Sequence, residues 1–157
     1  MTTRVSVNKI GKQRIVDAAG NDRGDIDVLA FHPESRSMFA VEAKDFEVAR
    51  TPAEMANELE KLFAGKKGKK STIQLHSKRI DWLRQHLDEV MLSLGANIDV
   101  APRWQVIGAV VTSEPLITPL VSSSTLPVIP YDDLTLEALN PTRAHVKRSS
   151  KKRRRRR

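Results

Sequence analysis

Residues 24–44, GDIDVLAFHPESRSMFAVEAK, decide the fold that this sequence predicts. Two apolar runs, residues 26–31 and 38–41, flank a segment that contains proline and serine. Short runs rich in Val, Phe and Ala on either side of such a segment are typical of a β-hairpin. We therefore expect two antiparallel strands joined by a turn at residues 32–37.

Both strands carry charged residues where a buried strand would be apolar. Asp25 and Asp27 lie at the start of the first strand, and Glu42 and Lys44 lie at the end of the second. Because side chains alternate along a strand, Glu42 and Lys44 share one face, and Asp27 shares a face with Asp25. If the hairpin closes, Asp27, Glu42 and Lys44 converge on one side of the sheet.

Two carboxylates beside a lysine can form a site for a hard divalent cation, with a group that can handle water. The same residues have a second interpretation. Glu42 and Lys44 can be a weak ion pair on an exposed strand face, and Asp27 can be a solvated acid near a turn. The residues alone leave both interpretations open.

The rest of the chain predicts an α/β domain. A loosely alternating run at residues 4–10, with a short continuation at 14–16, adds a first strand and gives a three-stranded antiparallel meander. The apolar, β-branched run at 104–111 predicts a central strand covered on both faces. A short strand at 126–129 and a short helix at 132–139 complete the domain.

Two helices are predicted between the meander and the central strand. The sequence Thr-Pro-Ala-Glu at residues 51–54 combines an N-cap, a proline at the first helical position and a capping-box glutamate. Apolar residues then recur at helical spacing, which predicts a helix over residues 52–63. Ser71 and Gln74 form a second capping box, and the apolar spacing after them predicts a long helix that ends near Gly95.

Composition excludes several classes of protein. The 157 residues contain no Cys, so disulfides, zinc–thiolate sites and thiol nucleophiles are excluded. The N-terminus has no apolar run typical of a signal peptide, and no stretch has the roughly 18 apolar residues that a membrane helix needs. We therefore expect a soluble, cytoplasmic protein.

Basic charge is concentrated at the C-terminus. The formal net charge is +8, but nine of the 27 Lys and Arg residues lie from Lys147 onward, which leaves 18 against 19 Asp and Glu in the remainder. We expect a near-neutral domain at residues 1–140 and a disordered basic tail at 141–157. The tail can be a phosphate-binding arm or a chain end without a function. As an arm it would bind nucleic acid through residues that include Lys151, Lys152, Arg153 and Arg154.

A second basic cluster lies between the two predicted helices. Residues 65–70 read GKKGKK, and Lys66, Lys67, Lys69 and Lys70 give this loop four positive charges. The loop can be a solvated linker, or it can clamp the phosphates of a nucleic-acid backbone near the site. Aromatic residues are few and lie mostly in apolar patterns, so a base-stacking platform is not expected.

The segments around the paired acids resemble motifs of the PD-(D/E)XK nuclease superfamily, which has the restriction-endonuclease-like fold. Gly24-Asp25-Ile26-Asp27 is similar to the motif of the family's second strand, and Glu42-Ala43-Lys44 is similar to the Glu-x-Lys motif of its third strand. Later helices and strands also follow in the family's order, so the resemblance covers about residues 4–139. It implies a mixed sheet with flanking helices.

The resemblance further implies a metal-dependent deoxyribonuclease. Asp27 and Glu42 would bind Mg²⁺, or Mn²⁺ in its place, with the backbone carbonyl of Ala43 as another ligand, which agrees with the preference of Mg²⁺ for oxygen. Lys44 would position the attacking water and neutralise charge that develops on the phosphate. Asp25 would be either a solvated acid or a second ligand.

Polar residues on the long helix and in the hairpin turn have structural explanations. Gln74 resembles a polar position that the family often uses near the site, and its role in the capping box explains it equally well. His76 and His86 are expected on the helix surface rather than as ligands. His32 is expected in the hairpin turn, away from the metal end.

The sequence departs from the family pattern at two points. Ile26 stands where the family motif has proline, a change that many members tolerate. The family core also begins with a helix, whereas only residues 1–3 precede the predicted first strand. Either a homodimer, a partner chain or a different packing covers the sheet face left by that helix, or the domain is a shortened and inactive version.

The leading prediction is a magnesium-dependent nuclease that hydrolyses DNA phosphodiester bonds with Asp27, Glu42 and Lys44. One alternative is a catalytically inactive nuclease-fold protein that binds nucleic acid or scaffolds a complex. Another is a basic-tailed protein associated with RNA or ribosomes, whose acids are incidental. Convergence of Asp27 and Glu42 in space distinguishes the nuclease from this last alternative.

Overall fold

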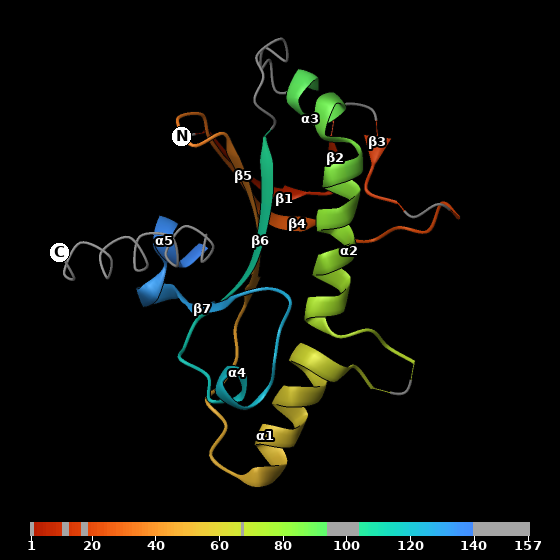
Figure 1. Cartoon of the computed structure of the whole chain (residues 1–157). Helices are drawn as coiled ribbons and strands as arrows, with labels where there is room; N and C mark the ends of the chain where they lie inside the picture. Colours follow the sequence, from red (N-terminus) through yellow and green to blue (C-terminus); the bar gives the residue numbers. More distant parts are fainter. Residues whose placement is uncertain (1, 11–12, 17–18, 67, 94–103, 140–157) are drawn as a thin grey trace, which may run out of the picture.

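A five-stranded mixed sheet forms the centre of the protein (Figure 1). The structure is a computed structural model that describes residues 2–10, 13–16, 19–66, 68–93 and 104–139. The strands of the main sheet are β1 (Thr2–Val7), β4 (Ile26–His32), β5 (Ser37–Lys44), β6 (Gln105–Thr112) and β7 (Val128–Pro130). A separate two-stranded ladder consists of β2 (Lys9–Ile10) and β3 (Gln13–Arg14).

Helices flank this sheet on both sides and extend beyond one end of it (Figure 1). The α-helices are α1 (Pro52–Leu59), α2 (Thr72–Gln85), α3 (Leu87–Ser93), α4 (Thr118–Val121) and α5 (Leu136–Leu139). A π-helix, η1 (Glu60–Ala64), extends α1, and a 3₁₀-helix, η2 (Tyr131–Asp133), precedes α5. The predicted α/β fold with a mixed sheet is therefore confirmed.

The strand order is β1-β4-β5-β6-β7. Strands β1, β4 and β5 are antiparallel neighbours, which confirms the predicted meander, whereas β6 is parallel to β5 and β7 is parallel to β6. Parallel neighbours need a long crossover connection, and residues 45–104, which contain α1 and α2, provide it. Strand β5 thus pairs with β4, its partner in the hairpin, on one side and with β6, which follows the crossover, on the other.

The N-terminal strand differs from the prediction. The strand expected over residues 4–10 ends as β1 at Val7, and Lys9 pairs with Arg14 in the separate ladder. Ser6 has a φ of 51°, a left-handed conformation that disfavours a regular strand at this point. Lys9–Ile10 and Arg14 are extended as predicted, but they form the separate ladder instead of continuing the strand of the main sheet.

Both predicted capping boxes are confirmed. The Thr51 hydroxyl accepts a hydrogen bond from the Glu54 N–H, and the Glu54 carboxylate accepts one from the Thr51 N–H. Ser71 and Gln74 make the equivalent pair at the start of α2. The helix predicted over residues 52–63 corresponds to α1 and η1, because the local capping signals are strong.

The predicted long helix is broken into α2 and α3 at His86. The His86 ring stacks on the Trp82 ring with centroids 4.3 Å apart, and its Nδ1 lies 2.9 Å from the Trp82 carbonyl oxygen. The same carbonyl accepts the His86 backbone N–H, so side chain and backbone share one acceptor. The end predicted near Gly95 lies outside the described residues.

The sheet has an apolar core on each face. Helix α2 covers one face, where Leu29 and Ile80 pack, and α5 lies against the other, where Ala109 and Leu139 pack (Figure 1). Strand β6 contributes Val110 to the first core and Ala109 to the second, which confirms the predicted central strand covered on both faces. The expected homodimer or partner chain stays a prediction.

The C-terminal elements differ in detail from the prediction. The helix expected over residues 132–139 is divided into η2 and α5, because Leu134 and Thr135 between them are not helical. Helix α4 was not predicted, since a single turn is too short to show helical periodicity. The predicted basic tail lies outside the described residues.

Gly108 of β6 tests how closely α2 packs on the sheet. A Cβ atom at this position would overlap Cδ1 of the buried Ile80 and lie 3.3 Å from Cδ2 of Leu126. Gly108→Ala should therefore lower the free energy of unfolding by about 1–3 kcal/mol, the usual cost of overpacking, in urea titrations followed by circular dichroism. Adding Ile80→Val removes the overlapping methyl group and should restore part of this loss. No restoration would mean that the overlap is not the cause.

Candidate functional site

The register of the hairpin places Asp27 opposite Glu42. Val28 pairs with Val41 and Leu29 pairs with Ala40 in the antiparallel ladder of β4 and β5. Continuing this register by one residue sets Asp27 across from Glu42, and opposed residues of neighbouring strands project from the same face. The two predicted metal ligands therefore share one face of the sheet, as the alternation of side chains predicted.

Asp27 is half-buried and tied to the backbone of β5. Its Oδ2 accepts a hydrogen bond of 2.8 Å from the Ala43 N–H. This bond fixes the carboxylate beside the predicted Glu42-Ala43-Lys44 motif. Ala43 thus contacts Asp27 through its N–H, while the proposed ligand role of its carbonyl oxygen stays a prediction.

Glu42 is a buried carboxylate held by two cations. Only 5% of the residue is exposed. Arg79 Nη1 lies 2.5 Å from Oε2, and Lys44 Nζ lies 2.8 Å from Oε1. A buried charge needs such partners, because an isolated carboxylate would lose its hydration without compensation.

His76 of α2 lies inside this cluster, and its prediction as a surface residue was wrong. Its ring is fully buried, and its Nε2 lies 3.0 Å from the Ala40 carbonyl oxygen, which assigns the ring proton to Nε2. Its Nδ1 lies 3.7 Å from Glu42 Oε2 and has no hydrogen-bond partner among the described residues. His76 therefore supports the strand that carries Glu42.

The surroundings of the buried His76 ring shift its pKa in opposing directions. Burial lowers the pKa of His76 below its usual value, and Arg79 adds to this effect. The hydrogen bond to Ala40 and the negative charges of Glu42 and Asp27 act in the opposite direction. Burial dominates, so the ring is favoured in its neutral form.

Sequence reasoning missed Arg79 as well as His76, although the helix carried a signal for both. Ile73, His76 and Ile80 recur at helical spacing, and Arg79 lies three residues after His76. All four are buried. If the polar residues at the same helical spacing had been assigned to this buried face, His76 and Arg79 would have been predicted to lie against the sheet.

The two accessory residues of the prediction are both exposed. Asp25 is exposed in the segment before β4. Gln74 is also exposed, and its Oε1 accepts a hydrogen bond of 3.0 Å from the Ser71 N–H. The capping role of Gln74 is therefore confirmed.

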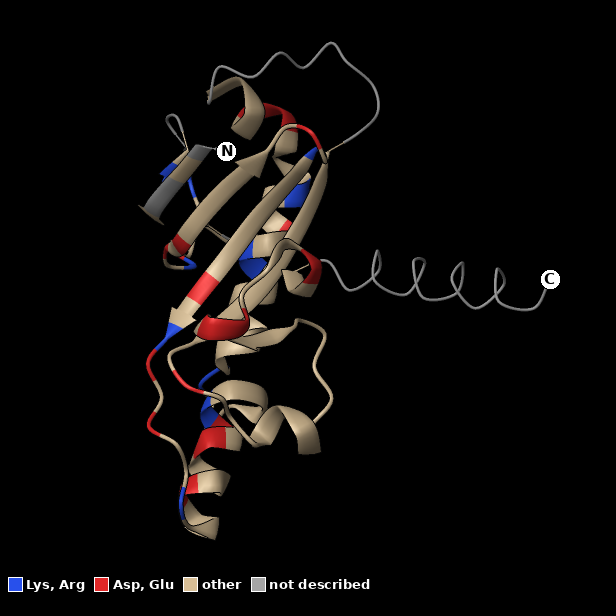
Figure 2. Ribbon diagram, turned by 90° about the vertical axis from the view of Figure 1, so that its left-hand side faces the viewer, with Lys and Arg blue, Asp and Glu red and all other residues tan. Residues whose placement is uncertain are grey.

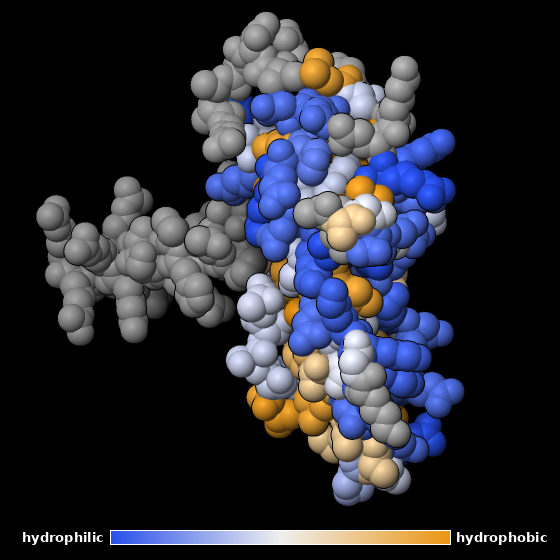
Figure 3. All heavy atoms as spheres, turned by 90° about the vertical axis from the view of Figure 1, so that its right-hand side faces the viewer, coloured by the Kyte–Doolittle hydropathy of each residue, from blue (hydrophilic) through white to orange (hydrophobic). Residues whose placement is uncertain are grey.

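A basic pocket adjoins Lys44. This cavity of about 520 Å³ is lined by five lysines but by only two acids, Asp45 and Glu60. The lysines are Lys44, Lys61, Lys66, Lys69 and Lys70. Figure 3 views the molecule from the α2 side and shows a mostly hydrophilic surface there. Most of the predicted lysine loop is thus brought beside the predicted catalytic lysine.

The remaining predicted nucleic-acid contacts are Lys67 and four residues of the tail. The Lys67 side chain and the tail residues Lys151, Lys152, Arg153 and Arg154 lie outside the described residues. Within the loop, Lys66 Nζ lies 2.7 Å from a Glu60 carboxylate oxygen, so part of the positive charge is compensated.

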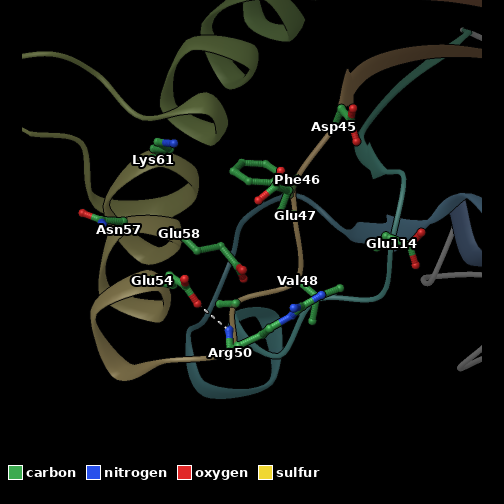
Figure 4. A pocket seen from close by; sticks show the side chains of 11 residues that line it. Asp45, Phe46, Glu47, Val48, Arg50, Glu54, Asn57, Glu58, Lys61 and Glu114 are labelled. Atoms are coloured by element: carbon green, nitrogen blue, oxygen red, sulfur yellow. Dashed lines mark hydrogen bonds between the residues drawn. The ribbon is translucent and has the colours of Figure 1, made fainter.

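A second, acidic pocket of about 800 Å³ lies between α1 and the segment after β5 (Figure 4). It shares Asp45, Phe46, Asn57 and Lys61 with the basic pocket, so the two pockets are neighbours. Figure 2 shows acidic residues along this segment and on α1. Glu58 points into the acidic pocket and accepts a hydrogen bond from Thr118 Oγ1.

Asp27 and Glu42 are the carboxylates of this cluster that could hold a metal ion. Among the residues that the structure describes, no three His, Cys, Asp or Glu side chains group as a metal site. Mg²⁺ is commonly held by one or two carboxylates, with waters and substrate phosphates as its other ligands. Asp27 and Glu42 could supply two such carboxylates once Lys44 or Arg79 leaves its Glu42 oxygen, whereas zinc would need more nitrogen or sulfur ligands.

Fold and site together define an α/β protein with opposed carboxylates and a lysine at one end of a mixed sheet. Residues 4–150 match the family described as "Anti-phage protein Upx-like", so the chain belongs to this family of anti-phage proteins. No curated protein and no solved structure gives a significant match. None of the helices described here combines the length and apolar character required to cross a membrane.

His76 predicts a loss of stability at mildly acidic pH. Its pKa is lower in the folded protein than the value of 6.5 for the free side chain, so the unfolded state binds a proton first as the pH falls. The contribution is fully present above that value and declines as the pH falls toward the lowered pKa. The urea midpoint in EDTA should therefore decrease from pH 7.5 to 5.5, and less steeply for His76→Gln. An equally steep decrease in the variant would implicate another group.

Proposed function

We propose that this chain is a metal-dependent nuclease that hydrolyses DNA phosphodiester bonds. The observation that carries the proposal is the placement of Asp27 opposite Glu42, with the Lys44 amine 2.8 Å from Glu42 at the edge of the basic pocket. Membership of an anti-phage family is compatible with this activity, because a phage genome is a nucleic acid.

Asp27 and Glu42 would hold Mg²⁺ or Mn²⁺, with the Ala43 carbonyl as a further oxygen ligand. A bound cation of this kind polarises a phosphate and lowers the pKa of a coordinated water. The hydrogen bond from Ala43 N–H to Asp27 fixes one carboxylate in place. Lys44 and Arg79 each bind one carboxylate oxygen of Glu42. Metal binding therefore requires at least one of these two side chains to leave its oxygen.

Lys44 is the residue of this site best placed to meet the substrate. About 37% of its side chain is exposed, whereas the Glu42 side chain is almost buried. Its amine can orient a water and neutralise charge on the phosphate that is being cleaved. The other lysines of the basic pocket would bind neighbouring phosphates, which position the backbone without reading its sequence.

The topology supports the same proposal. Three antiparallel strands, then helices, then a strand parallel to β5 follow the order that the resemblance to PD-(D/E)XK nucleases implies. Glu42 and Lys44 fall on β5, and Asp27 falls on β4, as the motif requires.

A second candidate is a catalytically inactive nuclease-fold protein that binds nucleic acid or scaffolds a complex. The observation in its favour is that Arg79 and Lys44 already occupy both oxygens of Glu42. The two candidates differ in one result: the inactive protein binds DNA and does not cut it.

Lys44→Ala should separate catalysis from metal binding. The substitution removes no metal ligand, so Mn²⁺ binding measured by calorimetry should persist. Cleavage of plasmid and single-stranded DNA should fall by about 100-fold or more, the scale for one positioned acid–base or electrostatic group. Asp27→Ala should instead lose metal binding and cleavage together.

Lys9→Ala, a change of an exposed lysine on β2, is the matched control and should cleave like the wild type. Wild-type protein that binds metal and DNA but cuts neither substrate would contradict the nuclease proposal and favour the inactive candidate.

The basic pocket predicts a salt-dependent contribution to DNA binding. Replacing Lys66, Lys69 and Lys70 by Gln should weaken binding and reduce the salt slope by about 2, if most of the three lysines each neutralise one phosphate. Fluorescence anisotropy at several salt concentrations measures both quantities.

A control with the same change in charge replaces three basic residues outside the basic pocket, Lys9, Arg14 and Arg84, by Gln. It should leave affinity and slope close to those of the wild type. Equal effects of both triple variants would mean that net charge, and not the pocket, binds the DNA.

A further inference from the structure

Arg79 connects three separate parts of the site. It lies on α2 and is only 7% exposed. Its Nε donates a hydrogen bond of 2.7 Å to the Arg23 carbonyl oxygen, and its Nη1 donates one of 2.5 Å to Glu42 Oε2. One planar guanidinium therefore joins the helix to β5 and to the turn that leads into β4.

Gly24 allows this contact. It has a φ of 74°, and a Cβ atom at this position would lie only 2.7 Å from Arg79 Nη2. The guanidinium thus lies directly against the backbone of Gly24. Because Gly24 is three residues before Asp27, Arg79 acts on the strands that carry both carboxylates.

The two oxygens of Glu42 are held unequally. Oε2 is bound by Arg79, whose side chain is 9% exposed, whereas Oε1 is bound by Lys44, whose side chain is 37% exposed. A guanidinium presents its donors in a fixed plane, while a lysine amine moves on a flexible stem. Oε1 is therefore the oxygen that can change partner at the smaller cost.

We propose that Arg79 is a positioning residue that holds Glu42 Oε2 and leaves Oε1 as the oxygen that faces the cation. This inference rests on the proposed nuclease function. By fixing Oε2 to the turn before β4, Arg79 sets the orientation of Glu42 relative to Asp27. Lys44 then transfers from Oε1 toward the phosphate when the cation binds.

The test compares Arg79→Met with the wild type in Mn²⁺ binding and in cleavage at saturating metal. Loss of Arg79 frees Oε2 and removes a positive charge beside the site, so Mn²⁺ should bind about threefold or more tightly. Cleavage should fall by about 100-fold, as expected when a reacting group is misplaced. Added guanidinium chloride at low millimolar concentration should restore part of the cleavage.

Arg84→Met is the matched control, because Arg84 lies on the same helix and pairs with Asp81 at the surface. It should match the wild type in both assays. Unchanged cleavage by Arg79→Met would overturn the proposal. A parallel loss of Mn²⁺ affinity and cleavage would also overturn it, since that result indicates structural damage.

If Arg79→Met does not fold, Arg79→Lys tests the proposal in its place. A lysine keeps the charge but cannot bind Glu42 and the Arg23 carbonyl with one rigid plane, so Mn²⁺ affinity should stay within about twofold while cleavage falls about tenfold or more. Wild-type cleavage by this variant would overturn the proposal.

If the wild-type protein does not cleave DNA, the proposed nuclease function is contradicted. The role of Arg79 is then tested by Mn²⁺ binding alone. Tighter Mn²⁺ binding by Arg79→Met, with affinity within about twofold of the wild type for Arg79→Lys, would then support the inference that Arg79 keeps Glu42 Oε2 from the cation. Unchanged or weaker binding would overturn it.

Discussion

The arrangement of the site depends on the burial of one charged side chain, Glu42. Removing one partner of a buried ion pair typically costs about 3–5 kcal/mol, because the remaining charge has neither water nor a counter-ion. Arg79 supplies the deep partner and Lys44 the partner near solvent. This requirement fixes α2 against β5 and brings the turn at Gly24 against the guanidinium. The position of α2 on the sheet thus determines both the packing of the apolar core and the geometry of the Glu42 ion pairs.

Local signals made most of the fold predictable. The hairpin followed from two apolar runs around a turn, and the starts of α1 and α2 followed from the capping boxes at Thr51 and Ser71. The position of Asp27 opposite Glu42 followed from alternation along the strands, since the register of a hairpin is set by its turn and its apolar face. Each of these features depends on residues that are close in sequence.

The contacts that Arg79 and His76 make with the sheet were not predicted. Arg79 and Glu42 are 37 residues apart, and the contact exists only once α2 lies on the sheet. Helical spacing could place His76 on the buried face of α2, but its partner, the Ala40 carbonyl, is known only from the structure. The break at His86 was missed because apolar residues continue at helical spacing on both sides of it, whereas the ring's interaction with Trp82 is specific to this structure.

The crossover between β5 and β6 has a consequence for the order of folding. The strands that carry Asp27 and Glu42 form a local hairpin, whereas β6 must wait for the closure of a loop through residues 45–104. Contacts distant in sequence form more slowly, because the chain entropy of the loop is lost before the contacts compensate for it. We expect a newly synthesised chain to bring Asp27 opposite Glu42 before α2 brings Arg79 to Glu42. Docking of α2 would then govern the assembly of the site. In a partly folded chain, Asp27 and Glu42 would be solvated.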